Sequence, residues 1–260
     1  MTDFRKNKIK AIDVHAHFGK GACSYKTETE ELVRYMDRLG IEWAIGSAFE
    51  AFTGDYVKGN EFAAQQVQSF RDRLRAYLII NPNYIENMEA YIDSVYDTGI
   101  FVGLKLHTDI HGHSPMSEDV LKIYEYAEEH SLPILSHNFG SFDMAGKIAL
   151  MFPRLKMIMA HGTARIKMPN HISEYEEVRA LSLKVKDRKD FYIDTATSVI
   201  PYGANELFAR LFGAERILFG TDMGFIDPAY SLARVLGGDF NEEDKKMILR
   251  DNAAKLFNIR

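Results

Sequence analysis

Short runs of apolar residues alternate along the chain with stretches in which apolar residues recur at helical spacing. Each run is rich in Ile, Val, Leu, Phe or Tyr, the composition typical of strands that are buried on both faces of a parallel sheet. We predict eight strands of this kind, at residues 11–17, 41–49, 74–80, 100–107, 132–137, 155–161, 191–197 and 216–222.

The stretches between these runs predict helices. One begins at Thr29, carries two glutamates in its first turn and ends at Gly40, a residue type that favours the left-handed backbone of a helix end. Ser117 is expected to cap a second helix, and Asn241 a last one that runs to residue 256. Less sharply bounded helices are predicted at residues 61–70, 85–98, 142–151, 174–183 and 205–212.

The predicted strands start roughly 30 residues apart, the length of one strand–helix unit. Eight such units predict an α/β fold, a distorted (β/α)8 barrel. An open doubly wound sheet would instead carry a glycine-rich phosphate turn after its first strand, which the sequence His-Ala-His-Phe-Gly at residues 15–19 does not match. No repeat, low-complexity segment or linker interrupts the pattern, so we interpret residues 1–260 as one barrel domain.

Composition narrows the classes of function. The formal net charge is −5, with 32 basic and 37 acidic residues, which argues against a nucleic-acid-binding protein. No apolar run approaches the ~18 residues of a membrane span. Cys23 is the single cysteine, so no intramolecular disulfide can form, and a reducing, cytoplasmic setting is expected.

Metal-competent side chains recur where the predicted strands end. His15 and His17 are two residues apart on the first strand, so both point to the same face. His137, His161 and Asp222 end the fifth, sixth and eighth strands. Active sites of such barrels lie at the carboxyl ends of the strands, and imidazole and carboxylate groups buried there need partners or a metal. The pattern predicts a site for a divalent metal.

The fourth strand ends with Lys105 and His107, which share a face. If His107 points into the barrel, Lys105 does so one layer deeper. A charged lysine is costly to bury, so Lys105 needs a carboxylate partner, a depressed pKa or covalent modification. Asp13 and Asp222 are the carboxylates in reach of an ion pair.

These residues resemble the amidohydrolase superfamily of metal-dependent enzymes, and within it the amidohydrolase-2 type. The resemblance spans nearly the whole chain, and its specificity lies in the order of the motifs. The matching segments are residues 12–17, 135–137, 159–162, 217–223 and a closing helix at 251–257. One departure is Gly224, where many relatives have proline, which bears on the shape of a loop.

The resemblance implies a role for each matched position. His15, His17 and Asp222 match metal ligands, and His137 matches a further ligand. His161 matches a position that binds a second metal or contacts the substrate and the activated water.

The resemblance also implies one or two divalent ions, most often zinc, in a distorted barrel. Lys105 resembles the lysine that is carboxylated and bridges the two ions in two-metal members, and many amidohydrolase-2 members work without it. Mixed His and Asp ligands also suit manganese, iron or cobalt. Relatives often form dimers or larger homo-oligomers.

The first hypothesis for function is a metal-dependent hydrolase of a small-molecule amide, lactone or ester. Asp222 would act as general base toward metal-activated water, and His161 would stabilise the oxyanion. The alternative is a metal-dependent, non-oxidative decarboxylase of an aromatic or enoic acid, which would need a further cation for the carboxylate. His107 and Arg165 are candidate substrate contacts, and Lys20 and Lys167 are further loop cations.

A third hypothesis is a non-catalytic metal-binding protein, since a fold does not fix a function. The joint presence of every strand-end ligand argues against it. Asp194 could orient a ligand histidine or cap a turn. An apolar substrate pocket has candidates in the aromatic residues of the loops: Tyr25, Phe49, Phe52, Tyr56 and Phe139.

Overall fold

The strands of the chain form one curled sheet. The computed structural model describes residues 10–20, 26–96, 99–162, 172–197 and 202–259. Within these, the strand order is β2-β1-β3-β4-β5-β6-β7-β8-β9, parallel throughout except for β2, which pairs antiparallel with β1. The strand bounds are β1 (Ala11–Lys20), β2 (Lys26–Thr27), β3 (Ile41–Ala48), β4 (Leu74–Ile79), β5 (Phe101–Leu106), β6 (Ile134–Ser136), β7 (Met157–Met159), β8 (Phe191–Asp194) and β9 (Ile217–Leu218).

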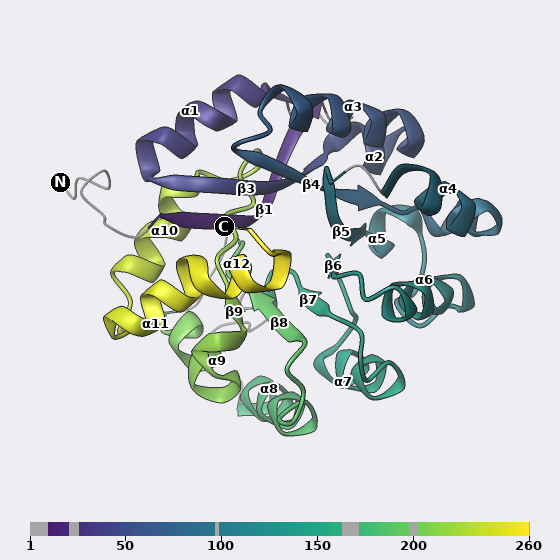
Figure 1. The fold of residues 1–260 in the computed structure, drawn as a ribbon. Helices are drawn as coiled ribbons and strands as arrows, with labels where there is room; N and C mark the ends of the chain where they lie inside the picture. Colours follow the sequence, from purple (N-terminus) through teal and green to yellow (C-terminus); the bar gives the residue numbers. More distant parts are fainter. Residues whose placement is uncertain (1–9, 21–25, 97–98, 163–171, 198–201, 260) are drawn as a thin grey trace.

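The two edges of the parallel sheet meet, so the sheet closes into a barrel. The N–H of Val14 in β1 donates to the carbonyl of Phe219, and the N–H of Asp222 donates to the carbonyl of His15 (2.9 and 2.8 Å). The N–H of His17 donates in turn to the carbonyl of Met223 (2.7 Å). All eight predicted strands are present, and the predicted (β/α)8 barrel is confirmed (Figure 1).

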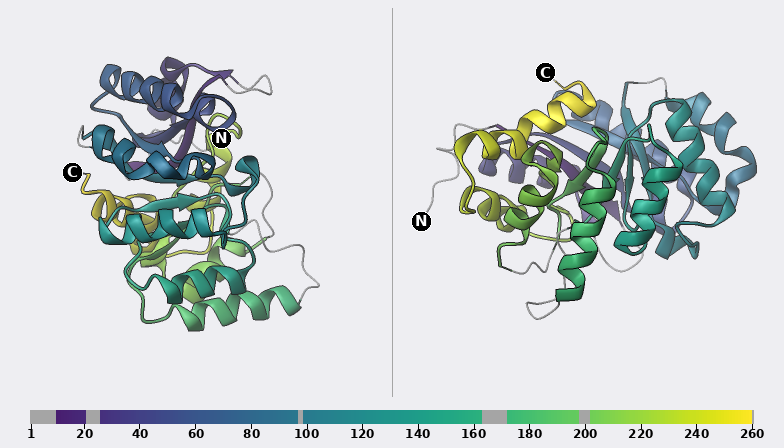
Figure 2. Two further views of the ribbon diagram at one scale, coloured as in Figure 1. Left: turned by 90° about the vertical axis from the view of Figure 1, so that its right-hand side faces the viewer. Right: turned by 90° about the horizontal axis from the view of Figure 1, so that it is seen from below.

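Helices surround the strands on the outside of the barrel (Figures 1 and 2). None in the described part of the chain combines the length and apolar character needed to cross a membrane. Their bounds are α1 (Thr29–Leu39), α2 (Phe49–Thr53), α3 (Tyr56–Ser69), α4 (Met88–Val95), α5 (Thr108–His111), α6 (Glu118–Glu129), α7 (Phe142–Met151), α8 (Ile172–Lys184), α9 (Ala204–Phe212), α10 (Pro228–Leu236), α11 (Glu242–Lys246) and α12 (Asn252–Phe257). Two 3₁₀ segments lie at Pro82–Asn87 and Ala214–Arg216.

The helix-end predictions hold at two of three places. Gly40 ends α1 in the left-handed conformation (φ 73°), and the side chain of Asn241 caps α11 by accepting the N–H of Asp244. Ser117 precedes α6, but its hydroxyl makes no capping hydrogen bond. Its Oγ atom lies 3.4 Å from Nδ1 of His113, so this contact takes the place of the cap.

The last predicted helix contains a π-helical turn at Met247–Asp251, between α11 and α12. The carbonyl of Ile248 in this turn accepts the N–H of Phe219 at 3.0 Å. A π turn commonly marks a place where a helical carbonyl is needed elsewhere. Here it fixes the closing helix to the end of the last strand.

The barrel interior is filled by apolar side chains below the level of the polar strand ends. Val14, Ile45 and Ile158 are fully buried in one cluster with the closing helix. Phe257 of α12 packs against Tyr77 of β4, with ring centroids 6.0 Å apart. Helix α12 thus covers the amino-terminal end of the barrel (Figure 1) and leaves the carboxyl ends of the strands for chemistry.

Candidate metal centre

His15, His17 and Asp222 converge because β1 lies beside the segment that follows β9. The Oδ1 atom of Asp222 lies 3.2 Å from Nε2 of His17 and 3.6 Å from Nε2 of His15. All three residues therefore turn ligand atoms toward one point. Both histidines are nearly inaccessible to solvent, and the Asp222 side chain is 13% exposed. The structure thus brings together the three residues that the sequence places first as metal ligands.

Asp222 and His161 both have left-handed backbone conformations, with φ of 60° and 54°. Residues other than glycine rarely adopt this conformation, and holding them there costs about 1–3 kcal/mol. A buried network fixes the turn at Asp222: the carboxylate of Asp13 accepts the N–H groups of His15 and Thr221 and the Thr221 hydroxyl. The strain places the Asp222 carboxylate over the paired histidines.

Asp194, at the end of β8, orients two histidines at once. Its Oδ2 atom lies 2.7 Å from Nδ1 of His15, and its Oδ1 atom accepts the N–H of His161 at 2.8 Å. Because Nδ1 of His15 donates to this carboxylate, Nε2 keeps a lone pair that can accept from a donor or bind a metal ion. Asp194 therefore orients a histidine, and its Oδ1 atom also accepts the N–H of Ala196 at 3.2 Å, so both sequence interpretations apply.

Lys105 is buried beneath the same histidine, and its side chain is 1% exposed. Its Nζ atom lies 2.8 Å from Nε2 of His15. Burial lowers the pKa of Lys105 to about 8, and the charges of Asp194 and Asp222 oppose that shift. Among the described residues, no carboxylate lies within ion-pair distance of Nζ. The ion pair with Asp13 or Asp222 that the sequence suggested is therefore not formed, and Nζ of Lys105 contacts His15 instead.

The remaining histidines form a wall from the centre toward solvent. The rings of His107 and His137 stack at 3.9 Å, His137 lies edge-on to His161 at 4.8 Å, and His161 lies 4.8 Å from His15. Nδ1 of His161 donates to the carbonyl of Ala196 at 2.7 Å, which leaves its Nε2 free. Nε2 of His137 lies 4.0 Å from the carboxylate of Asp109, so His137 is grouped with His107 and Asp109.

The electrostatics of the centre separate an ionised carboxylate from neutral imidazoles. Burial alone would raise the pKa of Asp222, but the hydrogen bond from His17 and the charges of His15, His17 and His161 hold it well below its usual range. Burial lowers the pKa of His107 to about 3, with Lys105 adding to the shift. At neutral pH, Asp222 is therefore a carboxylate and His107 is neutral.

Three aromatic rings lie against the imidazole of His17. Phe49 stacks on the imidazole at 5.3 Å, and Phe52 and Phe225 lie at 5.6 and 5.1 Å. The sequence analysis names Phe49 and Phe52 as candidates to line an apolar pocket. It does not name Phe225, which follows Asp222 in a loop without an aromatic pattern. The three rings, called the aromatic wall below, make an apolar face beside the metal-competent group.

Two other aromatic candidates have packing roles. Tyr56 stacks on Tyr84 at 5.4 Å, away from the histidines. Phe139 is fully buried against Tyr124. Tyr25 lies outside the described residues.

The loop cations are placed only in part. Lys20 is exposed at the end of β1, and its backbone N–H donates to Glu50 at 2.6 Å. Arg165 and Lys167, which the sequence suggests as carboxylate partners, lie outside the described residues, as does Cys23.

Comparison with known proteins agrees with the resemblance that the sequence motifs indicate. The model of the amidohydrolase-2 family, described as Amidohydrolase, matches residues 12–259. No curated protein sequence matches the chain.

Solved structures that share the fold include three with named activities. The 5-carboxyvanillate decarboxylase of Novosphingobium aromaticivorans, complexed with manganese and 4-hydroxy-3-methoxy-5-nitrobenzoic acid, is 14% identical, with a TM-score of 0.75 and all of both chains covered. The 2,6-dihydroxybenzoate decarboxylase of Rhizobium is 17% identical, with a TM-score of 0.72 and coverage of 96% of this chain and 99% of that one. A probable 2-pyrone-4,6-dicarboxylic acid hydrolase of Acinetobacter baumannii is 15% identical, with a TM-score of 0.69 and coverage of 96% and 100%.

Proposed function

Because the chain belongs to the amidohydrolase family, we propose that it is a metal-dependent, non-oxidative decarboxylase of a hydroxylated aromatic acid. The observation that carries this proposal is the position of the aromatic wall, which lies against His17 of the metal-competent group. Flat apolar faces beside a metal ligand suit a planar ring whose oxygens reach the metal. Two of the three similar structures are named as decarboxylases of hydroxylated aromatic acids, which supports the same substrate class.

The donor set fits one divalent ion. Imidazole nitrogens and a carboxylate oxygen suit zinc and manganese alike, and one of the decarboxylases above was crystallised with manganese. The hydrogen bond from Nδ1 of His15 to Asp194 leaves Nε2 as a ligand atom, as in metal sites generally. His15, His17 and Asp222 would hold the ion, with His137 or His161 as a further ligand. When bound, the ion supplies positive charge that orients the substrate oxygens and stabilises charge developing on them.

Asp222 moves the proton in this proposal. It is ionised at neutral pH, so it can give a proton to carbon only after accepting one. A hydroxyl group beside the carboxylate of the substrate is the nearest source. The proton passes from that hydroxyl to Asp222 and then to the ring carbon that bears the carboxylate. The bond from this carbon to the carboxylate breaks, its electron pair stays on the ring carbon, and carbon dioxide leaves.

The other site residues bind and orient the substrate. His161 and His107 face the same space, and the neutral imidazole of His107 offers a nitrogen to a substrate oxygen. Lys105 stays unmodified, and the positive charge of its ammonium group lies below the site. Arg165 stays a proposed contact of the substrate carboxylate.

The hydrolase stays the second candidate, because an ionised Asp222 carboxylate can equally accept a proton from metal-bound water. The 2-pyrone-4,6-dicarboxylic acid hydrolase has the same fold. The test is to load the chelator-treated protein with manganese or zinc and offer 2,6-dihydroxybenzoate and 2-pyrone-4,6-dicarboxylate in parallel. Release of carbon dioxide and resorcinol supports the proposal. Ring opening of the pyrone without carbon dioxide release would replace it with the hydrolase.

A further inference from the structure

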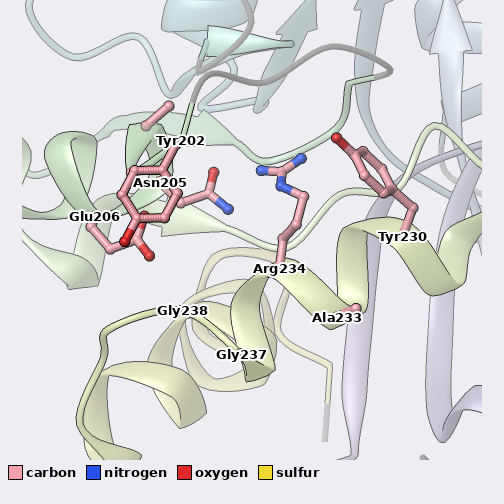
Figure 3. Close-up of a pocket in the computed structure, with 10 residues that line it drawn as sticks. Tyr202, Asn205, Glu206, Tyr230, Ala233, Arg234, Gly237 and Gly238 are labelled. Atoms are coloured by element: carbon pink, nitrogen blue, oxygen red, sulfur yellow. The ribbon is translucent and has the colours of Figure 1, made fainter. Parts of the chain in front are cut away.

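A pocket lies between the start of α9 and the last turns of α10, and none of the metal-competent residues lines it (Figure 3). It encloses about 360 Å³, at the lower end of the range for small-molecule sites. The segment after α10 comes close to α9 here, since a Cβ atom added at Gly238 would lie within 2.9 Å of Oε1 of Glu206.

Arg234 of α10 brings a buried positive charge to this pocket. Its Nη1 and Nη2 atoms are both inaccessible to solvent and have no hydrogen-bond partner among the described residues. The guanidinium carbon lies 5.3 Å from the ring centroid of Tyr230. Burial lowers the pKa of Arg234, whereas the charges of Tyr230 and Glu206 and the approach of the Tyr230 hydroxyl to the guanidinium raise it. A buried guanidinium stays charged and is costly without acceptors for its N–H groups.

The neighbouring carboxylate of Glu206 does not accept hydrogen bonds from the Arg234 guanidinium. Oε1 of Glu206 accepts the N–H of Asp239 at 3.1 Å. No ion pair joins Glu206 to Arg234 in the part of the chain that the structure describes. Two parallel N–H donors of an arginine match the two oxygens of a carboxylate, and no carboxylate of the described residues pairs with Arg234.

Asn205 of α9 contributes an unmatched acceptor to the same space. The residue is 3% exposed, and its Oδ1 atom is buried without a hydrogen-bond partner. Figure 3 shows the side chains of Asn205 and Arg234 reaching into the space between the two helices. Buried polar atoms in proteins nearly always have partners, so each unpaired one calls for an explanation.

We propose that this pocket binds a small carboxylate that also carries a hydroxyl or amino group. The carboxylate would accept from Nη1 and Nη2 of Arg234, and the hydroxyl or amino group would donate to Oδ1 of Asn205. The ring of Tyr230 would cover an apolar or aromatic part of the ligand. The proposal does not depend on the chemistry at the metal centre. The ligand class includes 2-hydroxy acids and amino acids, and also the hydroxylated aromatic acids proposed above as substrates.

The test uses mandelate as the probe, with phenylacetate and mandelamide as analogues that lack the hydroxyl and the carboxylate. Titration calorimetry on the chelator-treated full chain keeps the metal centre out of the measurement. We expect mandelate to bind at least tenfold more tightly than either analogue, because a lost hydrogen bond that leaves a buried partner unpaired costs about 1–3 kcal/mol, and 1.4 kcal/mol is a factor of ten. Repeating the titration with 2,6-dihydroxybenzoate distinguishes the proposed substrate from an unrelated acid as the source of the ligand.

Variants separate this pocket from any other site. Arg234→Gln should abolish mandelate binding, and Asn205→Ala should lower it to the level of phenylacetate while leaving phenylacetate unchanged. Arg210→Gln, an exposed charge in the last turn of α9, is the matched control and should bind as the wild type does. Asp222→Asn should also bind normally, which would exclude the metal centre as the site.

Stability gives a second readout. Arg234→Gln removes a buried, unpaired charge, so it should raise the midpoint of thermal unfolding of the ligand-free protein and remove the increase caused by mandelate. Arg234→Lys, which keeps the charge without the two parallel donors, should fold and bind weakly. Unchanged mandelate binding in the Arg234 variants, or no binding to the wild type at millimolar concentrations, would overturn the proposal.

Discussion

The Nδ1 atom of His15 lies 2.7 Å from the Oδ2 atom of Asp194, although the two residues are 179 positions apart in the chain. The contact fixes the ring orientation and the protonation of His15, and the other oxygen of Asp194 accepts the N–H of His161. One carboxylate thus sets the geometry of two strand ends.

Asp194→Asn should weaken metal binding by about 10–100-fold, the usual effect of losing a partner behind a metal-bound histidine. An amide cannot accept from His15 on one side and from two backbone N–H groups on the other. Competition with a chelating dye measures the affinity. Asp187→Asn, an exposed change near the start of the same strand, is the control. Equal metal affinity in both variants would show that Asp194 has no positioning role.

Asp222→Asn should abolish turnover while leaving the barrel folded. The change removes both a metal-ligating oxygen and the proposed proton carrier, and loss of a general acid–base group alone typically costs a factor of about 10²–10⁴. Steady-state kinetics under saturating metal, with circular dichroism for the fold, check this outcome. An active Asp222→Asn enzyme at saturating metal would contradict the role given to this residue.

Phe225→Ala should raise KM for an aromatic substrate about 3–10-fold, with a smaller change in kcat. The ring is 44% exposed and lies beside His17 and Phe49, so its removal takes away contact area without opening the core. Aromatic pairs contribute about 0.5–1.5 kcal/mol beyond the buried area. Leu183→Ala, an exposed apolar truncation on α8, serves as the comparison. A selective fall in kcat would show that Phe225 affects the reaction step instead of binding.

The metal content of the protein should be near one ion per chain and should not depend on bicarbonate. Nζ of Lys105 lies against a ligand nitrogen of His15 and is proposed to remain an amine. Plasma mass spectrometry of protein purified without chelators, with and without bicarbonate, gives the ratio. A value near two that requires bicarbonate would instead establish a carboxylated, bridging Lys105. Lys105→Met would then lose one ion.

Asp143 on α7 should make the free energy of unfolding depend on pH in the acid range. Its carboxylate accepts from Lys147 and Lys184 at 2.8 and 2.5 Å, and these hydrogen bonds lower its pKa from 3.8 to about 2. A depressed carboxyl pKa contributes stability above the unfolded value, and that contribution is lost as the pH falls from about 4 to 2. Asp143→Asn should therefore flatten this part of the urea-unfolding profile, and Lys184→Met should do so in part. Profiles that keep the wild-type slope would exclude the contribution.

The strand pattern could be predicted because buried parallel strands have a distinct composition, and all eight were found. Helix α10 was missed, although Asp227 and Pro228 form a typical helix start and Asp227 caps it. The helix lies between the last predicted strand and the last predicted helix. These two already completed the eighth strand–helix unit, so no further helix was expected there. Without α10, the pocket at Arg234 could not be anticipated.

The metal-competent group could be predicted because two positions on one strand and the end of the last strand fix where the side chains point. The partners of individual side chains could not. The sequence left three alternatives for Lys105, a carboxylate partner, a depressed pKa or covalent modification, and its Nζ atom lies against His15. His137 is turned by its stacking on His107, a contact between two strands that depends on rotamers and not on spacing.

The closure of the barrel between β1 and the segment after β9 also determines when the centre can come into being. His15 and His17 leave the ribosome early, and Asp222 follows about 200 residues later. At about 5–20 residues per second, that interval lasts roughly 10–40 seconds. During this time the nascent chain carries a pair of histidines without the carboxylate that completes their set. If the ion binds at these residues as proposed, its capture would mark the end of folding, and it would stabilise the contact between the first strand and the last strand to be made.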